Sequence, residues 1–87
     1  MAEESPLVRA LGLAYHWRGL MESSRFKTLS EIAEAEGLDK GQVSRMMRLT
    51  RLAPDIVADV LAGKGEFRLE RLMRQGVPRD WEEQRVM

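Results

Sequence analysis

The chain has 87 residues, and its 14 lysine and arginine residues balance 14 aspartate and glutamate residues, which gives a formal net charge of zero. This length suits one small domain, and the absence of cysteine excludes disulfides and thiolate metal sites. No segment approaches the roughly 20 consecutive apolar residues that a membrane-spanning helix needs. Neutrality is unusual for a nucleic-acid-binding protein, because such proteins tend to be basic overall.

Helix-forming residues dominate the sequence, and no stretch shows the alternation of apolar and polar residues that is typical of a strand. We therefore predict an all-α protein, a small bundle of five to six helices forming a single domain over residues 1–87. The first ten residues carry acidic side chains where a signal peptide carries basic ones. We accordingly expect a cytoplasmic protein.

The first predicted helix runs from Pro6 to about Glu22. Ser5 is suited to cap its start, and proline fits the first helical position, where no partner for the N–H is needed. Apolar residues then recur at helical spacing: Leu7, Val8, Leu11, Ala14, Tyr15, Trp17, Leu20 and Met21. We expect Trp17, together with Trp81 near the C-terminus, to pack the ends of the bundle.

Two further capped helices are predicted between about residues 28 and 52. Thr28 and Glu31 fit a capping box, in which side chains at a helix start bond to unpaired N–H groups. Ile32 gives the short helix a buried face. Gly37 is placed to end it, because glycine adopts a left-handed backbone without steric cost.

The second helix of this pair is predicted from residue 40 to about residue 51, with Asp39 and Gln42 fitting another capping box. Its inner side carries Val43, Met46 and Met47, and its outer side carries Lys40, Ser44, Arg45 and Arg48. The segment from Lys40 to Leu52 holds four basic residues and no acidic one. This pattern is typical of a helix-turn-helix whose second helix reads the major groove. Two capped helices with solvated arginines also occur in other small helical domains.

The remaining helices are predicted from Pro54 to Gly63, around Leu69–Met73 before Gly76, and around Trp81. Their apolar residues are Ile56, Val60, Leu61, Leu69 and Leu72. These side chains form either a surface for a second copy of the chain or simply part of the core.

The segment from Thr28 to about Gly63 resembles the helix-turn-helix of the ParB/KorB group of DNA-binding proteins. The matching motifs are Glu31-Ile32-Ala33, Val43-Ser44-Arg45-Met46-Met47-Arg48-Leu49 and Leu52-Ala53-Pro54. The chain is also similar to small proteins and C-terminal tails associated with phage-type serine recombinases. That similarity rests on Trp17-Arg18, Ser30-Glu31-Ile32-Ala33, Val43-Ser44-Arg45, Leu52-Ala53-Pro54-Asp55-Ile56-Val57 and Trp81-Glu82. These resemblances imply DNA binding, but neither a nucleotide-dependent clamp nor a recombinase catalytic domain, since the chain has no room for either.

Arg45 is the strongest candidate for reading a base, because one guanidinium can bond to both O6 and N7 of guanine. Ser44 is short enough to let the helix approach the groove floor, and Gly41 would permit a close backbone approach. Lys40 and Arg48 would reach phosphates or flanking bases. Each of these residues also has a plain interpretation as part of a solvated helix face.

Three more residues complete the candidate site. Backbone N–H groups at a helix start bind phosphate well, which favours Lys27 and Thr28. Arg51 would extend the phosphate contacts or lie on the far side of the helix. Gln42 is a weaker candidate for base reading, since the capping box would occupy its side chain.

Catalytic and cofactor chemistry have no support in the sequence. It shows no paired carboxylates in a plausible pocket, no glycine-rich phosphate loop and no nucleophile–base pair, and His16 is the only histidine. We therefore expect no enzyme, no cofactor and no metal site.

The sequence thus predicts a sequence-specific protein for double-stranded DNA, acting in transcription regulation or as an accessory factor of a phage or mobile element. A homodimer would bind two half-sites about 34 Å apart. The alternative is a protein-interaction module that keeps the fold without binding DNA and contacts a recombinase or another phage protein. Charge neutrality and the apolar C-terminal helices favour this alternative.

Overall fold

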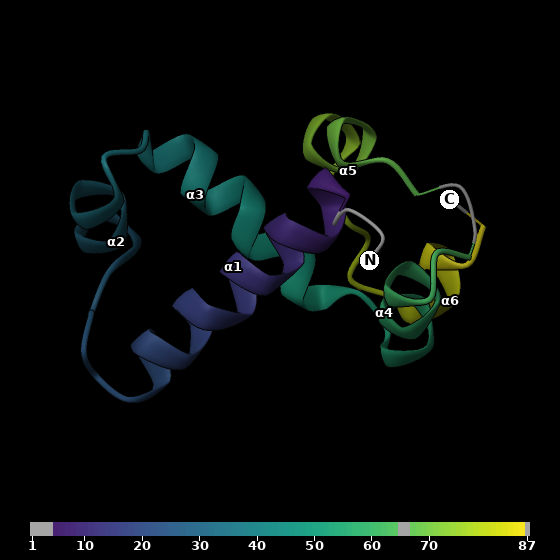
Figure 1. Ribbon diagram of the computed structural model, residues 1–87, viewed down its shortest axis with the longest axis horizontal. Coiled ribbons are helices and arrows are strands. Elements are labelled where there is room, and N and C mark those ends of the chain that lie inside the picture. Colours follow the sequence, from purple (N-terminus) through teal and green to yellow (C-terminus); the bar gives the residue numbers. More distant parts are fainter. Residues whose placement is uncertain (1–4, 65–66, 87) are drawn as a thin grey trace.

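Figure 1 shows the computed structural model, which describes residues 5–64 and 67–86. The elements in chain order are α1 (Pro6–Glu22), α2 (Leu29–Glu36), α3 (Lys40–Met47), the 3₁₀ turn η1 (Arg48–Arg51), α4 (Pro54–Leu61), α5 (Leu69–Gln75) and α6 (Trp81–Gln84). The described residues contain no strand, which confirms the predicted all-α class. None of the helices in this part of the chain has the length and apolar character needed to cross a membrane.

Helix α1 crosses the middle of the molecule and packs against α3, η1, α4 and α5 (Figure 1). It begins as expected, with the hydroxyl of Ser5 accepting a hydrogen bond from the N–H of Val8 at 3.1 Å. One stripe of the helix is buried and consists of Leu7, Ala10, Leu11, Ala14 and Trp17. Their spacing of three and four residues places them on one face, so α1 supplies the centre of the core.

The two tryptophans differ in their surroundings. Trp17 is fully buried in the core, and its indole N–H has no hydrogen-bond partner among the described residues. Its burial in the core agrees with the packing role that the sequence predicts for Trp17. Trp81 is 50% exposed, and its indole N–H donates to the carbonyl of Arg51 at 3.2 Å.

The C-terminal helices bury most of the apolar side chains for which we considered a role in dimerisation. Ile56, Val60 and Leu72 are buried and Leu69 is half-buried, all within the single core. Leu61 alone in this set is exposed, at 62%. The interpretation of these residues as a dimer surface is therefore wrong for the buried members, because α1 already covers them.

The turn between α2 and α3 depends on a left-handed glycine. Gly37 has a φ of 68°, and a Cβ added there would meet no atom within 4 Å. Gly37→Ala should therefore lower the free energy of unfolding by about 1–2 kcal/mol through backbone strain alone. Urea denaturation measures the change.

A matched control for this substitution is Gly12→Ala. Gly12 lies exposed within α1, and a Cβ there would also meet nothing within 4 Å. With a helical backbone, alanine at Gly12 should stabilise the protein by up to about 1 kcal/mol. Equal effects of the two substitutions would contradict the strained turn.

Candidate nucleic-acid interface

Helices α2 and α3 follow each other after a three-residue connection, and a side chain caps each of them. The hydroxyl of Thr28 accepts a hydrogen bond from the N–H of Glu31 at 3.2 Å. The carboxylate of Glu31 accepts in return from the N–H of Lys27, at 3.5 Å, rather than from the N–H of Thr28. The predicted capping box is therefore present with its return bond displaced by one residue.

The cap of α3 differs more from the prediction. The carboxylate of Asp39 accepts from the N–H of Gly41 at 3.0 Å, two residues along rather than three. Among the described residues, Gln42 makes no side-chain hydrogen bond, so the second capping box is wrong. Gln42 instead lines a groove with Met46 and with residues of α1 and α5. It thus lies at the side of α3.

The outer face of α3 carries the residues with the strongest case for DNA contact. Val43 and Met46 face the core, where α3 packs against α1 and α2. With 100° between successive residues, the side opposite Val43 presents Gly41, Ser44, Arg45 and Arg48. The two arginines are exposed, Gly41 and Ser44 are half-buried, and Lys40 is exposed at the start of the helix. This face therefore carries two long cations next to two short residues.

Gly41 has a packing role on this face. A Cβ at this position would lie 2.9 Å from a carboxylate oxygen of Asp39 and 3.2 Å from the guanidinium nitrogen Nη1 of Arg45. The missing side chain therefore leaves room for the helix cap and for the Arg45 guanidinium. Arg45 forms no ion pair within the described part of the chain, so its donors can bind another molecule.

The predicted helix over residues 40–51 tightens into a 3₁₀ turn after Met47. Within this turn, the hydroxyl of Thr50 donates to the carbonyl of Met47 at 2.8 Å. A 3₁₀ helix has three residues per turn, which aligns side chains three apart. Arg48 and Arg51 are therefore brought to the same side of the chain, although the sequence left the direction of Arg51 open.

Arg48 and Arg51 line a cleft of about 500 Å³ between η1 and the connection from α5 to α6. The opposite wall is formed by Gln75, Gly76, Val77, Pro78, Arg79 and Glu83. Arg79 was not among the predicted site residues. Nothing in its local sequence marks it, because it reaches the other arginines only through the fold.

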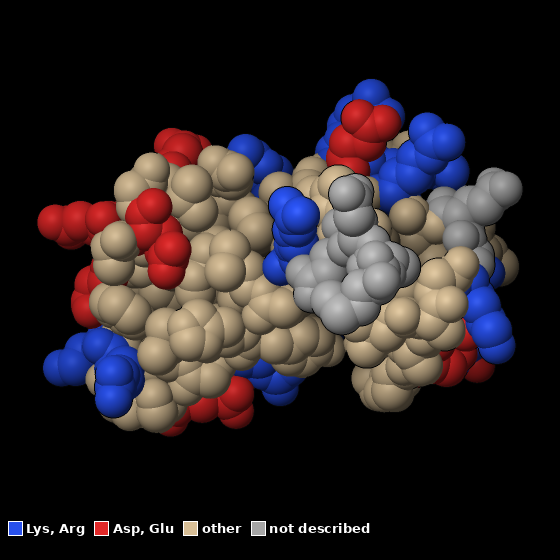
Figure 2. Space-filling view, in the orientation of Figure 1, with Lys and Arg blue, Asp and Glu red and all other residues tan. Residues whose placement is uncertain are grey.

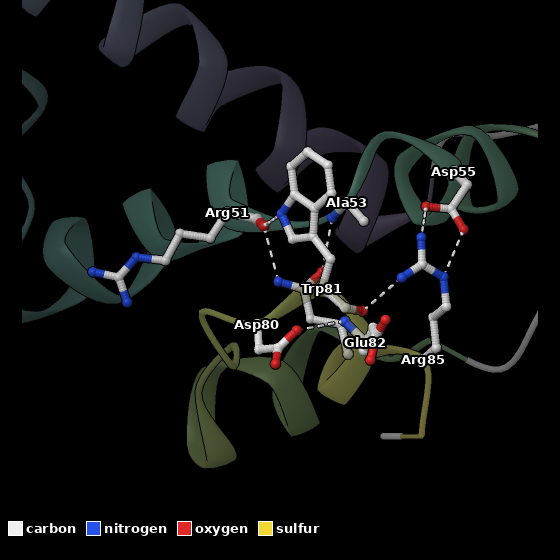
Figure 3. Close-up of polar contacts among 8 residues, drawn as sticks. Arg51, Ala53, Asp55, Asp80, Trp81, Glu82 and Arg85 are labelled. Carbon is white, nitrogen blue, oxygen red and sulfur yellow. Dashed lines mark hydrogen bonds and ion pairs between the residues drawn. The ribbon is translucent and has the colours of Figure 1, made fainter.

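The wall that carries Arg79 is held in place by the buried side chain of Gln84. Its amide oxygen accepts from the N–H of Ala53 at 2.7 Å, and its amide nitrogen donates to the carbonyls of Arg51 at 2.9 Å and Pro78 at 2.6 Å. Figure 3 shows Arg51 and Ala53 of this network, and the indole N–H of Trp81 that donates to the carbonyl of Arg51. The C-terminal turn is thereby fixed to the end of the candidate recognition helix.

A second contact supports the same attachment on the far side of α6. The guanidinium of Arg85 binds both carboxylate oxygens of Asp55 on α4, at 3.1 and 3.0 Å (Figure 3). This pair is exposed, so its contribution to stability is at most about 1 kcal/mol. The buried Gln84 network is the stronger of the two connections.

Both charges occur on the face shown in Figure 2. Acidic side chains are prominent around the α2 end of the molecule, with basic ones below them, and basic side chains are prominent around α5, with an acidic one among them. Helix α2 contributes Glu31, Glu34 and Glu36, all exposed. The cations of α3 and η1 have no acidic neighbour within the segment from Lys40 to Leu52.

Lys27 and Thr28 remain exposed at the start of α2, apart from the arginine cleft. The Thr28 oxygen accepts the capping bond, which leaves its hydroxyl proton available to a phosphate. Within the described ranges, no cluster of histidine and carboxylate side chains is suited to hold a metal ion. The structure therefore groups Gly41, Ser44, Arg45 and Arg48 on one face, and joins Arg51 to that face through the cleft.

Comparisons with known proteins find no matching family model, no similar curated protein and no similar solved structure. The function of the chain is accordingly inferred from the side chains of this site and from their arrangement.

Proposed function

We propose that this protein binds double-stranded DNA in a sequence-specific manner, with α2 and α3 acting as a helix-turn-helix and α3 lying in the major groove. The observation that carries the proposal is the outer face of α3. It presents the exposed Arg45 and Arg48 beside two short residues, Gly41 and Ser44. No acidic residue occurs between Lys40 and Leu52 that would repel phosphate.

Each of these side chains has a distinct part in the proposed complex. The short residues Gly41 and Ser44 let the helix axis approach the groove floor. Arg45 then reads guanine through a bidentate hydrogen bond. Lys40 and Arg48 bind flanking phosphates, which fix the register of the helix without reading sequence.

The start of α2 supplies a further phosphate contact in this proposal. The positive end of its dipole attracts an anion, and Lys27 adds a full charge that offsets the Glu31 carboxylate bound to the Lys27 N–H at the same helix start. Contacts at the starts of α2 and α3 would hold the DNA backbone on two sides of the groove. We include Thr28 as a hydroxyl donor to the same phosphate.

One module offers few base contacts, so we propose that the protein acts as a dimer on two half-sites about 34 Å apart. The resemblance to the ParB/KorB group and to recombinase-associated proteins favours a role in transcription regulation or as an accessory factor of a phage or mobile element. We place its action in the cytoplasm, where such DNA is accessible.

Selection from a random duplex library with the purified protein tests the proposal. We expect one enriched motif, palindromic if the protein dimerises. Titration of that duplex at several salt concentrations should show affinity falling steeply, by a log–log slope of about 0.9 for each phosphate contact. Weak and equal binding to every duplex would contradict sequence-specific recognition.

A second candidate function has its own observation. An apolar groove of about 620 Å³ lies between α1 and α4, lined mainly by Val8, Leu11, Leu13, Tyr15, Val57 and Leu61. Such a groove suits the apolar face of a partner helix, and the alternative function is a protein-interaction module. Binding through this groove would depend little on salt, whereas phosphate contacts depend on it strongly.

A further inference from the structure

We propose that Arg48, Arg51 and Arg79 form a clamp for one phosphate of the DNA backbone at the C-terminal end of α3. The inference rests on the proposed DNA binding. It adds a part of the chain, the connection between α5 and α6, that lies outside the helix pair. The clamp would bind DNA regardless of base sequence.

The three arginines of the clamp line one cleft. The 3₁₀ geometry of η1 turns Arg48 and Arg51 to one side, and both line the same cleft as Arg79. Guanidinium groups present planar pairs of N–H donors that match phosphate oxygens. Three such groups around one cleft offer more donors than a single phosphate can use.

The N–H donors of these guanidinium groups are available to a bound anion. Across residues 5–64 and 67–86, none of the three guanidinium groups takes part in a hydrogen bond or an ion pair. The described residues do contain ion pairs elsewhere, between Arg18 and Glu22 and between Arg85 and Asp55. The cleft is therefore lined by three arginines whose donors remain available to an anion.

Glu83 is the one acidic residue that lines the cleft. It makes no ion pair with the three arginines, and its charge opposes a bound phosphate. Its presence yields a prediction of opposite sign at the same site. Neutralising Glu83 should strengthen DNA binding, whereas neutralising Arg79 should weaken it.

The wall of the cleft that carries Arg79 is held by hydrogen bonds from Gln84. Pro78, directly before it, accepts a hydrogen bond from the buried Gln84 side chain, which also binds the carbonyl of Arg51. One side chain thus connects the backbone beside two of the arginines. A clamp that is held open in this way loses little entropy when phosphate binds.

The test compares Arg79→Ala with Arg68→Ala by fluorescence anisotropy. Arg68 is an exposed arginine at the other end of α5, away from the cleft, and its replacement changes the net charge equally. The probes are the selected duplex and a random-sequence duplex, titrated over a series of salt concentrations. Arg79→Ala should weaken both by the same factor, on the order of fivefold, and lower the salt slope by about 0.9. Arg68→Ala should leave the slope unchanged, and Glu83→Gln should strengthen binding to both duplexes.

Two results separate the clamp from the proposed function. If Arg79→Ala matches Arg68→Ala while the wild type still prefers its selected site, the clamp is wrong and the proposed function stands. If the wild type binds neither duplex, the clamp and the proposed DNA binding are both wrong. A changed base preference in Arg79→Ala would also overturn a backbone contact. If Arg79→Ala proves to be poorly folded, the affinity of Glu83→Gln tests the clamp. Stronger binding to both duplexes supports the clamp, and unchanged binding contradicts it.

Discussion

Replacing Arg45 and Arg48 by alanine together is expected to abolish specific DNA binding and to leave the melting temperature nearly unchanged. A bidentate arginine–guanine contact contributes about 1–3 kcal/mol of discrimination. Loss of the base contact of Arg45 should then cost about 1–3 kcal/mol, or roughly 5-fold to 150-fold in affinity, and loss of the phosphate contact of Arg48 on η1 adds to it. Titration of the selected duplex measures this loss.

The stability of that double variant follows from the surroundings of the two side chains. Both are exposed, and within the described residues neither forms a hydrogen bond or an ion pair through its guanidinium. Substitutions at such positions change the free energy of unfolding by about 0.5 kcal/mol or less. Thermal denaturation should therefore superimpose on that of the wild type.

The matched control removes two positive charges at the start of α5 and within it, in the variant Arg68→Ala/Arg71→Ala. Arg71 makes only an exposed hydrogen bond to Gln75 at 3.3 Å. This control should keep the selected site and lose affinity only through the general charge effect. If both double variants bind alike, α3 does not read the DNA, and the interaction-module alternative gains support.

Much of the fold could be predicted from the sequence because its helix boundaries are set by local chemistry. Ser5, Thr28 and Asp39 each cap a helix through their own side chains. Gly37 and Gly76 end helices with a positive φ. These residues act over two to four positions, a range at which a sequence pattern is informative.

Two predictions from the sequence were wrong because tertiary contacts, rather than local sequence, determine where these side chains lie. Gln42 fits a capping box in sequence, but its side chain lines the groove beside α1 and α5. Ile56, Val60 and Leu72 show the spacing of an apolar face, and that spacing cannot tell a partner's surface from the chain's own core. Here α1 covers that face.

The roles of Arg79 and Gln84 could not be predicted from the sequence for a different reason. Gln84 lies 31 residues from its partner Ala53 and 33 from Arg51, and a lone glutamine carries no signal of burial. Arg79 joins Arg48 and Arg51 only because that network fixes the C-terminal turn. The candidate face of α3 could be predicted, whereas the cleft at its end could not.

Gln84→Leu is expected to lower the free energy of unfolding by about 2–6 kcal/mol, because two polar groups lose their partner and each costs about 1–3 kcal/mol. Leucine fills a similar volume but leaves the buried N–H of Ala53 and the carbonyl of Pro78 without their partner. The carbonyl of Arg51 keeps the Trp81 indole. A domain of this size has a total stability of roughly 4–13 kcal/mol, so this loss is a large share. Urea denaturation measures it.

Gln75→Leu is the matched control, since Gln75 is exposed and its side-chain oxygen accepts only the exposed bond from Arg71. It should change stability by about 0.5 kcal/mol or less. Equal midpoints for the two variants would show that Gln84 does not hold the C-terminal turn. If Gln84→Leu is destabilised and still folded, Arg79 should lose its fixed place beside η1. The salt dependence of DNA binding by Gln84→Leu should then approach that of Arg79→Ala. Both variants lose the same phosphate contact, because the wall of the cleft that carries Arg79 is no longer held beside η1.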